Sequence, residues 1–325
     1  MGVAKGRHHR MTPQVRSRGH RQSGKGDRWM TSKKGKVSVL SALLDPVPVD
    51  VFLNRYFGRR PLYVRGSPGK FDALLKPARF IHGLDRVAEI RCVFGELRQA
   101  TIGPVDIREM YEAGATICVT GMELAHPALR RAARRIEDDL GYAGRIDVRA
   151  YLSPPGTGFD FHYDARVATS LQLDGAKTWW YSTAPEVEFP TQNSNRADMA
   201  GTLRAVGRHT LRRVTLKPGD LLCLPPGVWH KAKAGAGGSL ALNLAFNHVD
   251  GTVADVLVRY LRDALSSVPE ANRPFYTGTD GTDLRALATQ IEASLNGVKS
   301  AIAKLEAPRR IERLSASAKR SRQRP

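Results

Sequence analysis

The sequence predicts a mainly β protein with flanking α-helices. Between residues 145 and 248, short β-rich runs are separated by Gly, Pro and Asp, whereas the segments before and after have mixed or helical patterns. Several short strands at near-regular spacing are typical of a sandwich or barrel, because a doubly wound parallel sheet would need long helices between its strands. We therefore expect an all-β core with α/β elements before it and helices after it.

Each expected strand is a short apolar run that ends near a turn residue. The runs that fit this description are Pro61–Arg65, Glu89–Phe94, Thr116–Val119, Ile146–Ser153, Ala168–Leu173, Thr178–Ser182, Leu211–Leu216, Leu221–Leu224 and Leu240–Asn247. Pro127–Leu140 has apolar residues at three- and four-residue spacing and stops before Gly141, which predicts an amphipathic helix. Further helices are expected around Phe52, at Val253–Leu265 and at Leu284–Leu305.

The chain of 325 residues is 42% apolar, which is enough for a core and excludes a wholly disordered chain. Its net charge of +20 is concentrated at the two ends: residues 1–36 contain eleven Lys and Arg against one acid, and residues 297–325 contain nine against two. Segments this basic and this poor in apolar residues do not offset the entropy lost on ordering, so we expect flexible arms. Such arms can bind nucleic acid through phosphates, although solvated tails without a partner are commoner.

Three cysteines, Cys92, Cys118 and Cys223, are far apart in the sequence and form no CxxC pair. This pattern predicts neither a disulfide framework nor a thiolate zinc site, and it fits a reducing cytoplasm best. The basic N-terminus lacks the apolar stretch of a secretory signal, and no run of about 18 apolar residues is present. We therefore expect a cytoplasmic protein with no membrane partner.

A first short motif, Phe161-His162-Tyr163-Asp164, follows a loop rich in Gly and Pro. In an extended segment residues i and i+2 project to the same face, so the imidazole of His162 and the carboxylate of Asp164 can point at one place. Taken alone, an HxD pattern is more often a polar loop.

A second motif runs from Pro218 to His230. In it a Gly-Asp turn leads into an apolar strand, a Pro-Pro-Gly turn reverses the chain, and His230 begins the next strand beside Trp229. The alternative is a histidine that only packs in the core, but the turn residues fix where His230 falls. Together the two motifs offer two imidazoles and one carboxylate, the facial triad that binds non-haem Fe(II) and leaves other coordination positions open. Zinc also accepts this set, but the helical HExxH motif of many zinc hydrolases is absent.

The segment Leu171–Tyr181 is predicted to form two strands joined at Asp174-Gly175, since Asp-Gly is a strong hairpin signal. It places Lys177 on a strand among aromatic residues, where an ammonium group would be costly to bury without an anion. A surface lysine is the alternative, and propensity alone favours it.

With these motifs, residues 48–250 resemble the JmjC-type, cupin-fold oxygenases that depend on Fe(II) and 2-oxoglutarate, particularly the ribosomal oxygenases and their asparaginyl-hydroxylase relatives. The HxD motif, the lysine and the Gly-Asp-x4-Pro-x-Gly-x-x-His run occur in the order of that family, and Phe52–Gly66 is similar to its opening helix and strand. The resemblance implies a double-stranded β-helix (jelly-roll) core at about 145–248.

Four regions follow from the resemblance and the charge pattern: a basic flexible arm at 1–36, the JmjC/cupin domain at 37–250, a helical region at 251–305 and a basic tail at 306–325. A homodimer through 251–305 and packing of this region on its own barrel are both open. Because this region has room for only a few helices, we expect no winged-helix module of the kind that ribosomal oxygenases usually carry.

The family's functional residues fall on a small set of positions. By resemblance, the iron ligands are His162, Asp164 and His230, and the lysine that pairs with the C5 carboxylate of 2-oxoglutarate is Lys177. Tyr151 is similar to a tyrosine that contacts the co-substrate, and Asn243 to a small polar residue near its C1 carboxylate. The chain departs from the family at Phe159, which replaces a hydroxyl residue, and at Ala168, which replaces a polar one.

The resemblance implies hydroxylation of a side chain of a protein or peptide, with a ribosomal protein as one such substrate. Two alternatives stay open: the same chemistry on RNA or a small metabolite, and a non-catalytic cupin that binds a partner. Arg166, Trp179 and Tyr181 are candidates for facing the substrate, although a strand Trp more often fills the core.

Overall fold

A computed structural model describes residues 38–95, 98–194, 198–246 and 252–266, and a few helical positions between 288 and 299. These residues form two compact units, of which the first contains residues 38–140 and 146–246. The predicted basic arm at 1–36 and the basic tail at 306–325 lie outside the described residues, as does most of the helix expected at Leu284–Leu305.

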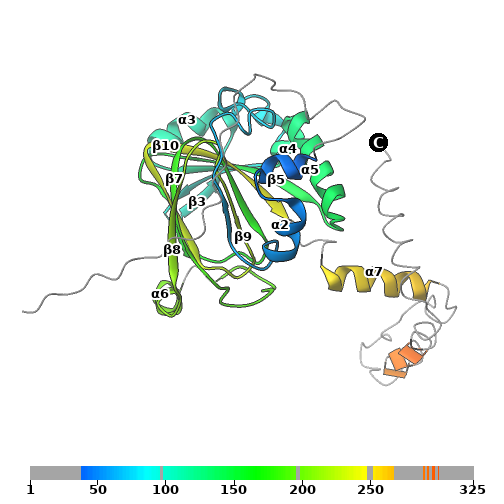
Figure 1. Cartoon of the computed structure of the whole chain (residues 1–325). Coiled ribbons are helices and arrows are strands. Elements are labelled where there is room, and N and C mark those ends of the chain that lie inside the picture. The colour runs from blue at the N-terminus through cyan, green and yellow to red at the C-terminus, as the bar shows by residue number, and fades with distance from the viewer. Residues whose placement is uncertain are drawn as a thin grey trace, which may run out of the picture. The chain divides into compact units, whose positions relative to one another are not determined.

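Ten antiparallel strands build the first unit (Figure 1). In chain order they are β1 (Leu62–Val64), β2 (Glu89–Phe94), β3 (Arg98–Thr101), β4 (Thr116–Thr120), β5 (Ile146–Ser153), β6 (Gly158–His162), β7 (Ala168–Ser182), β8 (Leu211–Leu216), β9 (Leu221–Leu224) and β10 (His230–Phe246). They pair in the order β1-β9-β7-β10-β5-β4-β2-β3, with β6 also paired to β10 and β8 to β7. The mainly β architecture predicted from the sequence is confirmed.

The two longest strands, β7 and β10, each belong to two sheets. The first half of β7 pairs with β9 and with the second half of β10, whereas its second half pairs with β8 and with the first half of β10. The first half of β10 also pairs with β6, and its second half pairs with β5. The larger, first sheet contains β1, β9, the first half of β7, the second half of β10, β5, β4, β2 and β3. The smaller, second sheet contains β8, the second half of β7, the first half of β10 and β6. Two sheets that share their long strands in this way form the double-stranded β-helix expected from the family resemblance.

The hairpin predicted at Asp174-Gly175 is wrong, because β7 continues without a break from Ala168 to Ser182. Gly175 (φ 62°) and Gly238 (φ 74°) both have left-handed backbone conformations. Their backbones approach so closely that a Cβ on Gly175 would lie 2.3 Å from the carbonyl oxygen of Gly238. The Asp-Gly pair therefore marks the point where one strand crosses from the first sheet into the second, and it does not reverse the chain.

Short helices surround the sheets, and most of those that contact a strand pack on the larger sheet. The helices are α1 (Val39–Leu44), α2 (Val49–Arg55), α3 (Ile107–Glu112), α4 (Met122–Ala125), α5 (Pro127–Leu140) and α6 (Met199–Val206), with short 3-10 turns η2 (Pro77–Arg79), η3 (Leu84–Arg86) and η4 (Pro104–Asp106). Helix α5 has the predicted bounds, and its apolar stripe is buried, with Ile136 fully enclosed. Helices α4 and α5 pack on β5, and α1 packs on α5, so these helices support the strand from outside (Figure 1).

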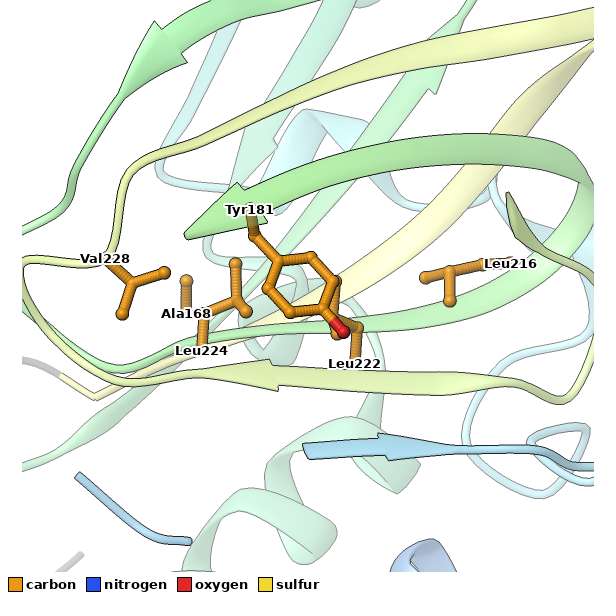
Figure 2. Close-up of a cluster of buried hydrophobic side chains, with 6 residues drawn as sticks. All are labelled: Ala168, Tyr181, Leu216, Leu222, Leu224 and Val228. Atoms are coloured by element: carbon orange, nitrogen blue, oxygen red, sulfur yellow. The ribbon is translucent and has the colours of Figure 1, made fainter. Parts of the chain in front are cut away.

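A cluster of apolar side chains packs between β7, β8 and β9 (Figure 2). Its members are Ala168, Tyr181, Leu216, Leu222, Leu224 and Val228. The ring of Tyr181 lies among the aliphatic side chains and is 5% exposed, so this residue is part of the core and does not face a substrate. Each large side chain buried in this way stabilises the fold by about 1.5–3 kcal/mol.

The second unit contains helix α7 (Val253–Leu265), at the position expected for the first C-terminal helix. Val253, Leu257 and Val258 of this helix are exposed. The homodimer through residues 251–305 stays a prediction. In the part of the chain that the structure describes, no helix is both long and apolar enough to cross a membrane.

Replacing Gly175 by alanine should destabilise the protein by about 2–4 kcal/mol, because the new Cβ is forced into a left-handed backbone and against the Gly238 carbonyl. Gly237→Ala is the matched control, since a Cβ there meets nothing within 4 Å. The free energy of unfolding in urea measures both. Equal stabilities of the two variants would contradict the close approach of β7 and β10.

Candidate metal centre

The HxD motif lies where β6 ends. His162 is the last residue of β6 and is 6% exposed, while Asp164 follows two residues later. A hydrogen bond joins Nδ1 of His162 to the carbonyl oxygen of Asp160 (2.7 Å). A carbonyl can only accept, so Nδ1 carries the proton and Nε2 is the ring nitrogen with the lone pair.

The second motif folds as the sequence predicts, with a Gly-Asp turn, strand β9, a Pro-Pro-Gly turn and then β10. Asp220 stabilises the first turn, because its carboxylate accepts hydrogen bonds from the backbone N–H groups of Gly66 and Lys217 (both 2.9 Å). Gly227, with φ of 75°, closes the second turn. His230 then opens β10, and its Nδ1 donates to the carbonyl of Val228 (2.9 Å), so its Nε2 also carries the lone pair.

Backbone contacts bring the two motifs together. His230 is the direct register partner of His162 across the β6–β10 pair, and the N–H of Gly227 donates to the carbonyl oxygen of Asp164 (2.9 Å). As a result, ligand atoms of His162, Asp164 and His230 all lie within 4.8 Å of one another. Nε2 of His230 is 3.7 Å from Oδ2 of Asp164, and the two imidazole rings are 4.3 Å apart between centroids. One metal ion fits such a group.

Lys177 lies in the barrel interior and is 3% exposed, so the surface alternative for this residue is wrong. Its Nζ donates to Oγ of Ser153 at 3.1 Å and lies 5.9 Å from the centre of the Tyr151 ring. Burial lowers the pKa of this ammonium group to about 8. Among the described residues no carboxylate forms an ion pair with it, so its charge is stabilised mainly by a hydroxyl.

The three predicted iron ligands and the three predicted co-substrate residues all line one cavity of about 490 Å³. They are His162, Asp164, His230, Lys177, Tyr151 and Asn243. Tyr151 and Asn243 lie on neighbouring strands, β5 and β10, and burial raises the pKa of the Tyr151 hydroxyl, which therefore stays a neutral donor. Arg166 and Trp179 also line this cavity, as does Phe159.

Sequence reasoning missed several polar residues of the same cavity, three of them on β2 and β3 at the edge of the larger sheet. They are Glu89, Arg91, Gln99, Arg149, Thr169, Ser170 and Asn193. Arg149 stands two residues before Tyr151 on β5, so strand alternation gives it the same face. Once Tyr151 had been chosen as a candidate, this alternation along the strand could have identified Arg149 as well.

A surface loop supports the metal centre from outside. Glu186 accepts hydrogen bonds from Nε1 of Trp229 (3.0 Å) and from side chains of His209 and Arg208 (both 2.7 Å). Its backbone N–H donates to the carbonyl of Gly227. Burial alone would raise the pKa of Glu186, but these three hydrogen bonds outweigh it and hold the pKa at about 2.

The same loop also contacts the HxD motif. Oδ1 of Asn193 accepts from the backbone N–H of Ala165 (2.8 Å), and Oγ of Ser194 accepts from that of Tyr163 (3.0 Å). The residues on either side of Asp164 are therefore tied to the loop.

A double-stranded β-helix with two histidines and one aspartate at one end of its interior defines a cupin-fold metal centre of the facial-triad type. Residues 123–252 match the JmjC domain family. The chain is also similar to YxbC of Bacillus subtilis, with 26% identity over 71% of this chain and 76% of that protein. It is 27% identical to ribosomal oxygenase 1 of Rattus norvegicus over 76% of this chain but only 43% of the relative.

Among solved structures, the chain is similar to YcfD, a ribosomal oxygenase of Escherichia coli, in a complex with cobalt and 2-oxoglutarate. The TM-score is 0.52 at 17% identity, covering 80% of this chain and 68% of that one, and this likeness shows the fold. The match assigns residues 123–252 to a JmjC domain, and ribosomal oxygenases are among the relatives of the chain. The chain spans less than half the length of the curated ribosomal oxygenase that it matches.

Replacing Glu186 by glutamine should lower stability by about 1–2 kcal/mol at pH 7, because three donors lose their charged acceptor. The pKa of Glu186 is depressed in the folded state, so its contribution is present above about pH 4.5 and is lost as the pH falls toward 2. Thermal melts at pH 7 and pH 3 should therefore show a smaller difference between variant and parent at pH 3. Glu188→Gln, at an exposed position of the same loop, is the control. A constant difference at both pH values would contradict the assignment.

Proposed function

We propose that the protein is an Fe(II)- and 2-oxoglutarate-dependent hydroxylase that acts on a side chain of a protein or peptide. One observation carries the proposal: a two-histidine, one-aspartate group lines the same cavity as a buried lysine that has no carboxylate partner among the described residues. The histidine and aspartate group can bind a metal ion, and the lysine can bind an anion.

The donor set fits ferrous iron. His162 and His230 present Nε2 lone pairs because both Nδ1 atoms donate to backbone carbonyls, and Asp164 adds one carboxylate oxygen. Such backbone acceptors fix the tautomer and orientation of metal-binding imidazoles. When bound, iron together with 2-oxoglutarate and oxygen supplies the oxidising power that inserts an oxygen atom into a C–H bond.

Lys177 would hold the C5 carboxylate of 2-oxoglutarate. A buried ammonium group is stabilised by an anion much more than by a single hydroxyl, and a dianionic co-substrate provides that anion. Ser153 orients the lysine through its 3.1 Å hydrogen bond. Tyr151 would donate its hydroxyl proton to the same co-substrate, and Asn243 would contact the C1 carboxylate nearer to the metal ligands.

The remaining cavity walls orient the substrate and exclude water. Trp179 packs on the apolar cluster between β7, β8 and β9 and also lines the cavity, where its ring lies 5.8 Å from that of His230 between centroids. A cavity that excludes water and holds the substrate in place favours hydroxylation of the substrate over side reactions with water.

The names of the relatives support a protein substrate, and a ribosomal protein is the first to test. We also propose that the protein acts in the cytoplasm, because all three cysteines are buried free thiols.

Loss of one ligand should remove both metal binding and turnover. His162→Ala should weaken Mn(II) binding, measured by electron paramagnetic resonance, by more than about 100-fold and abolish succinate formation from 2-oxoglutarate with Fe(II). The exposed His82→Ala is the control and should behave as the parent. Unchanged Mn(II) affinity in the folded His162→Ala variant would overturn the proposal.

The substrate is tested by mass spectrometry of ribosomal proteins from host cells with and without the gene. A ribosomal substrate should carry one added oxygen atom only in cells that contain the gene.

Lys177→Met should raise the dissociation constant of 2-oxoglutarate by about 100-fold, because it removes the charge-assisted contact. In the parent, 2-oxoglutarate binding needs the protonated ammonium group, whose pKa is about 8. Its dissociation constant should therefore rise about tenfold between pH 7 and pH 9, a dependence that the variant lacks. Calorimetry with the Mn(II) form measures both, and Lys233→Met on the exposed side of β10 is the control. An equal pH dependence in parent and variant would contradict the assignment of Lys177 as the group that binds 2-oxoglutarate.

A further inference from the structure

Three arginines line the cavity that contains the metal group: Arg91, Arg149 and Arg166. Arg149 is the register partner of Asn243 on β10, and Arg91 is that of Cys118, which itself pairs with Tyr151. The two strand arginines therefore lie on the face of the larger sheet that carries Tyr151 and Asn243. Arg166 approaches from the loop that follows β6, two residues after Asp164.

The three arginines differ in how their charge is balanced. Nε of Arg91 lies 3.2 Å from Oε2 of Glu89, and its NH1 group donates to Oε1 of Gln99 at 2.9 Å. The Nε atoms of Arg91 and Arg149 are both buried and have no hydrogen-bond partner. The guanidinium group of Arg149 donates a hydrogen bond to the hydroxyl of Tyr151. Arg149 and Arg166 line the same cavity, and among the described residues neither of them forms an ion pair.

The charges of the cavity lining do not cancel. Four cations, namely Lys177 and the three arginines, face two acids, Glu89 and Asp164. A divalent metal ion adds two positive charges and the dianion of 2-oxoglutarate removes two, so an excess of two positive charges remains in the loaded cavity. Such an excess in a concave, partly desolvated site attracts anions.

We propose that Arg149 and Arg166 form a binding site for a carboxylate of the peptide substrate, so that the enzyme selects peptides with an acidic residue at or next to the hydroxylated position. This inference rests on the proposed function and narrows its substrate class. A guanidinium group binds a carboxylate through two parallel hydrogen bonds, and a bound anion offsets part of the excess positive charge of the cavity.

A peptide carboxylate fits this site better than a nucleic-acid backbone. The arginines lie within a cavity of about 490 Å³ beside Tyr151 and Asn243. A phosphate backbone is usually bound by a row of cations along an open surface, whereas one acidic side chain can enter a cavity of this size.

The test compares two fluorescent heptapeptide pools, with a fixed central Asp or a fixed central Asn, on the full chain loaded with Mn(II) and 2-oxoglutarate. Fluorescence anisotropy should show that the parent binds the Asp pool about tenfold more tightly than the Asn pool. Arg149→Gln/Arg166→Gln should abolish this preference. Arg130→Gln/Arg131→Gln removes the same charge from exposed positions of α5 and should retain it.

Several outcomes would overturn the inference. They are the absence of an Asp preference in the parent, its survival in Arg149→Gln/Arg166→Gln, and a loss of 2-oxoglutarate affinity in that variant as large as in Lys177→Met. Loss of binding to a single-stranded RNA oligonucleotide with unchanged peptide binding would assign the arginines to nucleic acid instead. Arg166→Lys, which keeps the charge but not the paired geometry, should show an intermediate preference and guards against misfolding of the double variant.

Failure of this inference is distinguishable from failure of the proposed function. Succinate formation by the parent with Fe(II) and 2-oxoglutarate tests the proposed function without any peptide. A parent that forms succinate but shows no Asp preference would reject only the acidic substrate.

Discussion

The metal centre depends on one local constraint, the pairing of the end of β6 with the start of β10. Because His162 and His230 are register partners, the two imidazoles meet wherever this pair of strands forms. The hydrogen bond from Gly227 to the carbonyl of Asp164 then sets the third donor relative to the other two. A one-residue shift of register would turn one histidine away from the interior, so correct pairing of the strands and assembly of the site are a single event.

The co-substrate end of the cavity has a different origin. Lys177 belongs to the second half of β7, just past the bend at Gly175, and the bend carries this half into the smaller sheet with His230. Ser153, at the end of β5 in the larger sheet, meets the lysine from the opposite side. The lysine and the metal group thus share one cavity because two strands cross between the sheets.

Local sequence patterns predicted much of this arrangement. Helix α5, most of the strands and the two metal-binding motifs were predictable, because turn residues and apolar periodicity act over short distances. The bend at Asp174-Gly175 was not, since the same dipeptide suits a hairpin and only the close approach of Gly238 makes it a crossing point. Glu186 was also missed, because its partners are distant in the sequence. Arg149 was missed although alternation from Tyr151 marks it, whereas Arg166 was already a candidate for facing the substrate. Tyr181 was misplaced because alternation alone does not tell one end of a barrel interior from the other.

The sharing of β7 and β10 between both sheets also limits how the protein can adapt. In a sandwich of independent sheets, the interior can widen when one layer slides over the other. Here every such displacement would break main-chain pairing on both sides of the shared strands, so the backbone enclosing the cavity is close to a rigid frame. Diversity in what the cavity accepts must then arise from exchange of individual side chains on that frame, and a change of specificity should need few mutations and no remodelling of the barrel.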